Sequence, residues 1–323
     1  MTNYKPGIVQ KILITGGAGF IGSSLADTLV EKRCRVSVID NFNTLYSPAL
    51  KRRNLLNLEK SELFTLHESD ITDRIRLDAL FKKEKPSVVV HIAGLTGMEA
   101  SMKNPFDFFN NNVTGTLNIL ECARLNGTGQ VIYISTSTVY GNSNVVSKED
   151  DSLTDPLNSY AASKLMAEQL CSQYARISPV RIIVLRLCTV YGPRQRPNMA
   201  IAQFVSRSLN SESVIIYGDG KASRDYLYID DCIRAILMAM DHPADFDVFN
   251  IGGPLRISIN ELLETLSALL DKSIRVKNVE SPAGIPVDCR LNINKARDVL
   301  GFNPETDFRE GIQQYINWYL KQQ

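Results

Sequence analysis

The chain has 323 residues, of which 44% are hydrophobic and 22% charged, so it is long enough for one large α/β domain or two coupled ones. Its 36 basic and 35 acidic residues nearly cancel, which argues against a general nucleic-acid or membrane-surface role because both need a sustained basic face. The first residues lack the apolar core of a signal peptide and no apolar run could cross a bilayer, so we expect a cytoplasmic protein.

Short apolar runs alternate with amphipathic segments along the first part of the chain. The runs are rich in Val and Ile without polar residues in alternation, which predicts strands buried on both faces. Such strands alternating with helices predict βαβ units and a Rossmann-like, doubly wound parallel sheet with right-handed connections. The expected strands are residues 11–15, 35–40, 87–93, 130–135 and 181–187, and the expected helices are residues 23–32, 74–83, 111–125 and 159–174.

After Leu187 the pattern loosens, and prolines separate shorter elements. Helices are expected over residues 260–270 and 308–320, while residues 225–240 and 248–252 are expected to return to the main sheet. We therefore predict an α/β fold with a smaller C-terminal lobe and a substrate cleft between the two parts. The predicted domains are a Rossmann domain over residues 8–192, with 225–252 returning to it, and a substrate-binding lobe over 193–224 and 253–323.

A glycine-rich segment, TGGAGFIG over residues 15–22, follows the first expected strand. Its glycines allow the backbone to approach a dinucleotide pyrophosphate, and the helix that follows would direct N–H groups and a positive dipole end at the phosphates. A glycine turn without a ligand is the alternative, but the flanking strand and helix favour dinucleotide binding. The expected ligands from this segment are Gly16, Gly19, Phe20, Ile21 and Gly22.

Asp40 ends the second expected strand, where a carboxylate can accept both hydroxyls of an adenine ribose and repel a 2′-phosphate. This favours NAD over NADP, although Asn41 and Arg52 nearby make the distinction less sharp. Asp70, which we place after a further strand, is expected either to bind the adenine amino group or to cap the following helix. The expected cofactor-binding residues beyond the glycine segment are Asp40, Asn41, Asp70, Ile71, Ala93, Tyr160 and Lys164.

Tyr160 and Lys164 are spaced i, i+4, so both point the same way from one expected helix. The phenol pKa of about 10 is too high for a base at neutral pH, but a nearby Lys cation and the positive nicotinamide ring both favour the phenolate. Thr136, at the end of an expected strand, can bond the same substrate hydroxyl. A Tyr–Lys pair alone often marks an ordinary helix surface, and it is the upstream glycine segment that favours proton transfer at a carbinol carbon.

The cysteines and histidines predict no further chemistry. The six cysteines contain no CxxC pair, so buried reduced thiols are expected rather than disulfides. The three histidines do not cluster, so no metal site is expected.

With these motifs the chain resembles the extended short-chain dehydrogenase/reductases, and within them the nucleotide-sugar epimerases and dehydratases. The resemblance implies Tyr160 as base, Lys164 as its activator and nicotinamide-ribose ligand, and Thr136 as third catalytic member. It also implies NAD, a UDP-sugar substrate with Arg224 on the diphosphate, and a homodimer; Arg224 as a surface charge is the alternative. The resemblance covers nearly the whole chain, and its marks are residues 15–22, Asp40, and residues 135–141, 160–164, 190–193, 224–226 and 250–253.

The residues after Thr136 separate the branches of this family. Its dehydratases carry an acidic pair there and its decarboxylating members a Glu two positions on, whereas this chain has Ser137 and Thr138. Neither hydroxyl is an acid or base near neutral pH, so elimination lacks a proton donor. The resemblance therefore favours epimerisation, in which one carbon is oxidised and reduced again.

Residues 41–51 and 194–200 resemble the corresponding segments of UDP-glucuronate 4-epimerases, and Thr189 stands where those enzymes have Thr and hexose epimerases commonly have Asn. A carboxylate at C6 of the sugar would be held by hydroxyls such as Ser137, Thr138 and Thr189 and neutralised by Arg196. Arg196 as a surface residue beside a proline turn is the alternative.

Two departures from that pattern concern charge. Glu99 replaces the Arg usual in glucuronate epimerases, and residues 283–286 lack an Arg that many relatives present to the diphosphate. A carboxylate near an anionic substrate is unfavourable unless it points away. The expected activity is C4 epimerisation of UDP-glucuronate to UDP-galacturonate, with a UDP-glucose or UDP-N-acetylglucosamine 4-epimerase as the alternative enzyme. The alternative outside catalysis is a protein that senses NAD or a nucleotide sugar, which would not need Tyr160 and Lys164.

Overall fold

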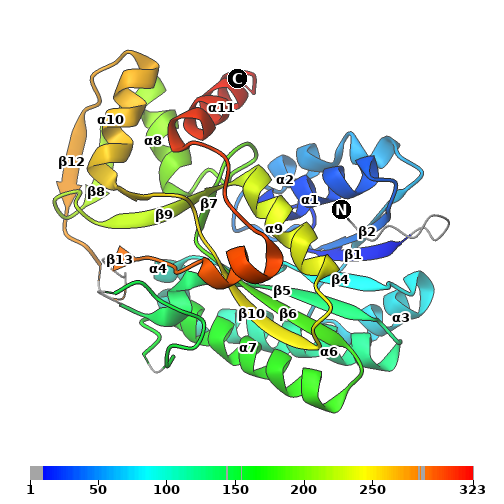
Figure 1. Ribbon diagram of the computed structural model, residues 1–323. Coiled ribbons are helices and arrows are strands. Elements are labelled where there is room, and N and C mark those ends of the chain that lie inside the picture. Colours follow the sequence, from blue (N-terminus) through cyan, green and yellow to red (C-terminus); the bar gives the residue numbers. More distant parts are fainter. Residues whose placement is uncertain (1–9, 143–144, 154, 283, 285–287, 323) are drawn as a thin grey trace.

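The centre of the molecule is a seven-stranded parallel sheet (Figure 1). The structure is a computed structural model that describes residues 10–322 except 143–144, 154, 283 and 285–287. The strand order is β10-β6-β5-β4-β1-β2-β3, so the predicted Rossmann-like sheet is confirmed, and the order reverses between β1 and β4, where ligands bind in such sheets. The strands are β1 (Lys11–Thr15), β2 (Arg35–Asp40), β3 (Phe64–Glu68), β4 (Val88–His91), β5 (Gln130–Thr136), β6 (Arg181–Leu187) and β10 (Phe246–Ile251).

Helices cover both faces of this sheet, because its strands carry apolar residues on both sides. In β1, Ile12 and Ile14 pack with residues of α1 (Phe20–Glu31) and α9 (Ile229–Asp241), whereas Leu13 packs toward the opposite face. That second face is covered by α3, α6 and α7 (Figure 1). Their bounds, with those of the shorter helices, are α2 (Pro48–Leu55), η1 (Leu58–Lys60), α3 (Arg74–Glu84), α4 (Met98–Lys103), α5 (Pro105–Phe109), η2 (Asn110–Thr114), α6 (Gly115–Leu125), η3 (Ser137–Tyr140) and α7 (Ser159–Ile177).

The later part of the chain forms two small sheets and a cluster of helices beside the main sheet (Figure 1). One sheet joins β7 (Thr189–Tyr191), β9 (Ser223–Tyr228), β11 (Arg256–Ser258) and β13 (Asp288–Cys289), and the other pairs β8 (Val214–Tyr217) with β12 (Val276–Val279). The remaining helices are α8 (Ala200–Leu209), α10 (Ile259–Leu270), η4 (Ala296–Leu300) and α11 (Phe308–Leu320).

The segment expected to return to the main sheet, residues 225–240, contributes to both parts. Its first residues belong to β9, which pairs with β7, β11 and β13 in the small sheet. Its later residues form α9, which packs on β5 and β6 of the main sheet. The expected strand 248–252 is β10, which pairs with β6 at one end of the main sheet.

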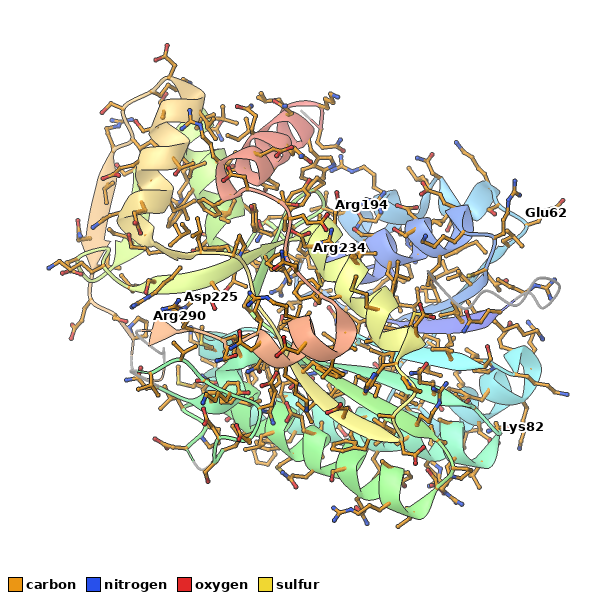
Figure 2. The ribbon with its side chains drawn as sticks, in the orientation of Figure 1. Glu62, Lys82, Arg194, Asp225, Arg234 and Arg290 are labelled. Atoms are coloured by element: carbon orange, nitrogen blue, oxygen red, sulfur yellow. The ribbon has the colours of Figure 1, made fainter. Side chains whose placement is uncertain are left out.

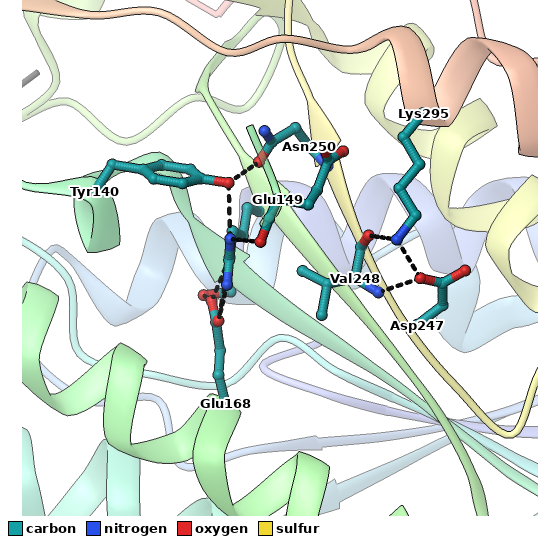
Figure 3. Close-up of polar contacts among 9 residues, drawn as sticks. Tyr140, Glu149, Glu168, Asp247, Val248, Asn250 and Lys295 are labelled. Atoms are coloured by element: carbon teal, nitrogen blue, oxygen red, sulfur yellow. Dashed lines mark hydrogen bonds and ion pairs between the residues drawn. The ribbon is translucent and has the colours of Figure 1, made fainter. Parts of the chain in front are cut away.

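Side chains occupy the outer edge of β10 (Figure 3). The Val248 N–H donates to Asp247 Oδ1 at 2.8 Å, and the Val248 carbonyl accepts from Lys295 Nζ at 2.9 Å. The Asn250 N–H donates to Glu149 Oε1 at 2.8 Å. These backbone groups of an edge strand therefore have partners without a further strand.

Within residues 10–322, gaps excepted, no helix is long and apolar enough to span a membrane. The segment assessed for a signal peptide lies mostly in residues 1–9, outside the described part. The described cysteines (Cys34, Cys122, Cys171, Cys188 and Cys232) are free thiols. In the same part of the chain, no group of three His, Cys, Asp or Glu side chains is arranged to hold a metal ion.

Candidate active site

A cleft of about 390 Å³ opens at the carboxyl ends of the central strands, beside the small sheets. Its walls bring together every residue expected in the site except Asp70, although these residues are spread over most of the chain. Those on the cofactor side are Gly16, Gly19, Phe20, Ile21, Gly22, Asp40, Asn41, Ile71 and Ala93. Those expected at the reacting centre and the sugar are Thr136, Ser137, Thr138, Tyr160, Lys164, Thr189, Arg196 and Arg224.

The glycine turn between β1 and α1 has no room for side chains. Gly16 has φ +69°, and a Cβ there would lie 2.9 Å from backbone atoms of Ala93. A Cβ on Gly22 would lie 2.3 Å from the Gly16 carbonyl oxygen. Helix α1 begins after Gly19 without a side-chain cap, so its first turn faces the cleft with backbone N–H groups. The glycine turn and the first turn of α1 together fit a dinucleotide pyrophosphate.

Asp40 is held in place at the end of β2. Its Oδ2 accepts from the Ala18 N–H at 3.1 Å and its Oδ1 from the Phe42 N–H at 2.8 Å. Lys51 Nζ lies 3.7 Å from Oδ1. These bonds fix the carboxylate at the rim of the glycine turn, where an adenine ribose would lie.

Lys51 and Tyr46 also line the cleft, although the sequence pattern did not single them out as site residues. The Tyr46 hydroxyl is buried without a hydrogen-bond partner among the described residues, and Lys51 Nζ lies 5.1 Å from the Tyr46 ring centre. Burial raises the pKa of Tyr46 to about 12 and lowers the pKa of Lys51. The only sequence signal for them was the likeness of residues 41–51 to the glucuronate epimerases.

Asp70 lies just outside the cleft, between two residues that line it, Ser69 and Ile71. Its carboxylate accepts bonds from Asn41 Nδ2 at 2.6 Å and from the Thr72 N–H and hydroxyl at 2.8 and 2.7 Å. Burial would raise the pKa of Asp70, but these bonds together lower it. The cap of α3 is Asp73 instead, which accepts from the Arg76 N–H.

Lys164 is buried against β5. Asn158 caps the helix that carries it, since its Oδ1 accepts from the Ala161 N–H at 2.9 Å. Lys164 Nζ donates to the Ile134 carbonyl at 2.6 Å and lies 4.1 Å from the centre of the Tyr133 ring. Burial lowers the pKa of Lys164 to about 7. Its ammonium is thus held beside the strand that ends at Thr136.

Tyr160 stands one turn before Lys164, but its electrostatics differ from expectation. The pKa of Tyr160 is raised because burial disfavours the phenolate, while a hydrogen bond with Thr136 and the charge of Arg196 oppose that effect. On balance, the surrounding protein therefore raises this pKa, whereas the Tyr–Lys spacing had led us to expect that it would be lowered. The positive charge of an oxidised nicotinamide ring is the remaining source of such lowering.

Arg196 enters the cleft from the loop after β7. Its Nη1 is buried and has no hydrogen-bond partner among the described residues. Burial lowers the pKa of Arg196, and Tyr160 and Tyr46 oppose this effect. A guanidinium with this unpartnered nitrogen, in the same cleft as the hydroxyls of Thr189 and Thr138, is suited to an anionic group.

Glu99 points out of the cleft. Its neighbours Gly97 and Met98 line the cleft, whereas its own carboxylate accepts a hydrogen bond from the Tyr217 hydroxyl on β8 at 2.6 Å. This contact raises the pKa of Tyr217. The unfavourable charge suspected from the sequence is therefore directed away from the space that a substrate would occupy.

Arg224 reaches the cleft from β9, next to a buried carboxylate. Arg224 Nη1 donates to the Ser223 carbonyl at 2.7 Å. Asp225 accepts from the Leu291 N–H at 2.9 Å, close to Arg290 (Figure 2), and burial raises its pKa to about 6. The bond from Leu291 joins β9 to the residues that follow β13. Residues 283 and 285–286, part of the segment noted for its missing Arg, lie outside the described residues.

A buried histidine ties the glycine turn to the second face of the sheet. Thr116 donates its hydroxyl proton to the Asn112 carbonyl, so it accepts from His91 Nε2 at 3.0 Å. His91 Nδ1 then accepts from the Thr15 hydroxyl at 2.7 Å, which itself accepts from the Ala93 N–H. Burial lowers the pKa of His91 to about 3, in keeping with a neutral ring.

Comparison with known proteins gives consistent matches over most of the chain. The family model described as the NAD-dependent epimerase/dehydratase family matches residues 12–252. The UDP-glucuronate 4-epimerase of Thermodesulfobacterium geofontis is 35% identical over 307 residues, which are 95% of each chain.

Solved structures match equally broadly. The crystal structure of UDP-glucuronic acid 4-epimerase from Bacillus cereus, in complex with UDP-glucuronic acid and NAD, is 33% identical, with a TM-score of 0.92 over 97% of this chain and 100% of that one. A UDP-N-acetylglucosamine 4-epimerase from Methanobrevibacter ruminantium M1, in complex with UDP-N-acetylmuramic acid, is 30% identical, with a TM-score of 0.89 over 97% and 99% of the two chains.

Proposed function

The chain belongs to the NAD-dependent epimerase/dehydratase family, and we propose that it interconverts UDP-glucuronate and UDP-galacturonate by NAD-dependent epimerisation at C4. The observation that carries the sugar assignment is the buried, unpaired Nη1 of Arg196 in the same cleft as Tyr160. A neutral sugar would leave this cation without a counter-charge, whereas a C6 carboxylate supplies one.

Tyr160 is the proposed base. It takes the proton of the sugar 4-hydroxyl, which Thr136 helps to align, and it returns a proton when the 4-keto sugar is reduced on the opposite face. Lys164 holds the nicotinamide ribose, and with it the positive nicotinamide ring that favours the phenolate of Tyr160. The bound NAD supplies the hydride acceptor and donor.

The hydroxyls of Ser137, Thr138 and Thr189, in the same cleft as Arg196, have a second proposed role. A 4-keto uronate has its ketone β to the carboxylate and therefore tends to lose CO2. Loss of CO2 requires the breaking bond to align with the ring carbonyl π system, so Thr189, Ser137 and Thr138 would suppress it by holding the carboxylate near the carbonyl plane. Ser137 and Thr138 replace the acidic residues of dehydratases, which supports epimerisation over elimination.

NAD is the proposed cofactor because the Asp40 carboxylate, fixed by Ala18 and Phe42, would repel a ribose 2′-phosphate. Epimerisation regenerates NAD in each cycle, so the purified protein should retain it. Denaturation followed by quantification of the released dinucleotide tests this. Release of NADP, or turnover only after cofactor is added, would contradict the assignment.

We further propose a homodimer in the cytoplasm. Helices α6 and α7 expose Leu117 and Met166, which are 37% and 48% accessible, on the outer face of the main domain. The free thiols in the described part of the chain are in keeping with a reducing compartment. Light scattering with size-exclusion chromatography tests the dimer, and a monomeric mass would contradict it.

A panel of UDP-sugars with product analysis tests the proposed function. UDP-glucuronate should be converted to UDP-galacturonate faster than UDP-glucose or UDP-N-acetylglucosamine is epimerised. Faster conversion of either neutral sugar would transfer the assignment to the hexose 4-epimerases. Binding without conversion of any sugar would favour the sensing protein, although such a protein has no need of Tyr160 and Lys164.

A further inference from the structure

Three consecutive residues of β5 bond to three residues of helix α7 that are spaced one turn apart. Thr136 is hydrogen-bonded to Tyr160, and the Ile134 carbonyl accepts from Lys164 Nζ. Between them, the Ser135 hydroxyl donates to Glu168, one turn beyond Lys164. Glu168 is only 4% exposed to solvent, and it does not line the cleft.

Glu168 is also bonded to the next strand of the sheet. Arg186 Nη2 lies 2.8 Å from Glu168 Oε2, and Arg186 Nε lies 3.1 Å from the same oxygen. Arg186 stands opposite Ser135 in the pairing of β5 with β6. One carboxylate therefore joins α7 to two adjacent strands at the level of the reacting residues (Figure 3).

The other side of Arg186 continues this contact into the wall of the cleft. Arg186 Nη1 donates to the Tyr140 hydroxyl at 2.7 Å, and that hydroxyl donates to Asn250 Oδ1 on β10 at 2.7 Å (Figure 3). Tyr140 ends the short helix η3, which also carries Ser137 and Thr138. The contacts that hold Glu168 thus extend to the residues proposed to bind the sugar.

We propose that Glu168 is a positioning residue for the reaction: bonded to Ser135 and Arg186, it fixes the position of α7 along β5, and with it the distances from Tyr160 and Lys164 to Thr136. This inference rests on the proposed function for the reaction, but it holds for whichever UDP-sugar is turned over. Glu168 acts through Tyr160 and Lys164 and contacts no substrate. Displacement of a reacting group by about 1 Å can lower a rate by about a hundredfold.

Glu168→Gln tests the proposal, with Glu121→Gln as matched control. Glu121 of α6 also pairs with an arginine, Arg124, and accepts a bond from Tyr174, which lies toward the end of α7 remote from Tyr160. Both variants are assayed as holoenzymes with the best substrate of the UDP-sugar panel. Glu168→Gln should lower kcat about ten- to a hundredfold with KM within twofold and NAD retained, while Glu121→Gln should leave kcat within twofold.

A double variant separates positioning from stability. Glu168→Gln leaves the Arg186 charge buried without its partner and should lower the melting temperature, whereas Glu168→Leu with Arg186→Met replaces the pair by apolar groups and should restore it. The double variant still lacks the bond from Ser135, so its kcat should stay low. Recovery of kcat together with melting temperature would overturn the proposal and leave Glu168 a purely structural residue.

Ser135→Ala decides the matter if the Glu168 variants fail to fold. It removes only the bond between β5 and Glu168 and keeps the ion pair with Arg186. A severalfold loss of kcat at unchanged KM would support the proposal, and an unchanged kcat would overturn it. Failure of the proposed sugar assignment is a separate result, because it appears in the wild-type substrate panel and not in these ratios.

Discussion

The Glu99 carboxylate and the Tyr217 hydroxyl, 118 positions apart in the chain, form a 2.6 Å hydrogen bond between α4 and β8. The bond directs this carboxylate away from the cleft, whose neighbouring wall is formed by Gly97 and Met98. Its consequence is that Glu99 does not set the charge of the sugar site.

Glu99→Gln should therefore change kcat/KM for UDP-glucuronate by less than about twofold. The amide keeps a hydrogen-bond acceptor for Tyr217, and the removed charge lies outside the cleft, where solvent screens it. Steady-state kinetics at low and moderate salt measure the effect. A tenfold gain with the variant would mean that Glu99 repels the substrate and that the uronate assignment needs revision.

Tyr160→Phe should reduce turnover at least about a thousandfold, because it removes the proton acceptor and leaves the helix intact. NAD should remain bound. Lys164→Met should reduce turnover and also weaken NAD retention, because Lys164 is proposed to touch the nicotinamide ribose. The two variants are compared by rate and by dinucleotide released on denaturation; near-normal turnover of Tyr160→Phe would show that the base is another group.

Arg196→Met should lower kcat/KM for UDP-glucuronate about ten- to a hundredfold, because a charge-assisted hydrogen bond is worth about 1.5–3 kcal/mol. Residual activity on UDP-glucose should hardly change. Thr189→Ala should in addition release some 4-keto pentose, detectable by mass spectrometry, because the carboxylate is held less firmly.

Arg194→Ala is the control for Arg196. Arg194 lies two positions away on the same loop but pairs with Asp27 of α1 at 2.6 Å (Figure 2). Its loss should affect both sugars equally. Equal losses on both sugars with Arg196→Met as well would remove the support for a carboxylate pocket.

His91 predicts a loss of stability in acid. Its pKa is about 3 in the folded protein and about 6.5 when unfolded, so the unfolded chain binds the proton first as pH falls. The resulting destabilisation of the folded state is absent above about pH 6.5. It grows as the pH falls from about 6.5 toward 3 and reaches about 2–3 kcal/mol at about pH 4.5. Urea unfolding of the wild type and His91→Gln at pH 7 and 4.5 measures it; the variant should lose less stability than the wild type over that interval, and equal losses would contradict the assignment.

The main sheet could be predicted closely because its strands are buried on both faces and their sequences are continuously apolar. β1 and β6 have the expected limits. The small sheets could not be predicted in this way, since strands such as β8 alternate buried and exposed residues over only Val214–Tyr217. The expected helix 111–125 contains a π-helical turn, η2, where Asn112 bonds to the Leu95 backbone and to Ser163. Such long-range bonds leave no periodic pattern.

The site residues were predictable where a motif fixed their spacing, as for Tyr160 and Lys164. The direction of the shift in the Tyr160 pKa could not be predicted, because it depends on burial by segments far away in the chain. Tyr46 lies in the loop before α2 and Lys51 in that short, largely polar helix, where no apolar periodicity marks either residue, so only the fold brings them to the cleft. The sequence contains one indication of the pair formed by Glu168 and Arg186. Arg186 is a charged residue inside the apolar run 181–187, and a charge buried in a strand requires a partner.

The edge of β10 has a consequence for how molecules of this protein can associate. Because the N–H and carbonyl of Val248 and the N–H of Asn250 already bond to side chains of their own molecule, a strand from a second copy could not pair with these groups. Growth of the main sheet past this edge strand, from one molecule into the next, is thereby hindered.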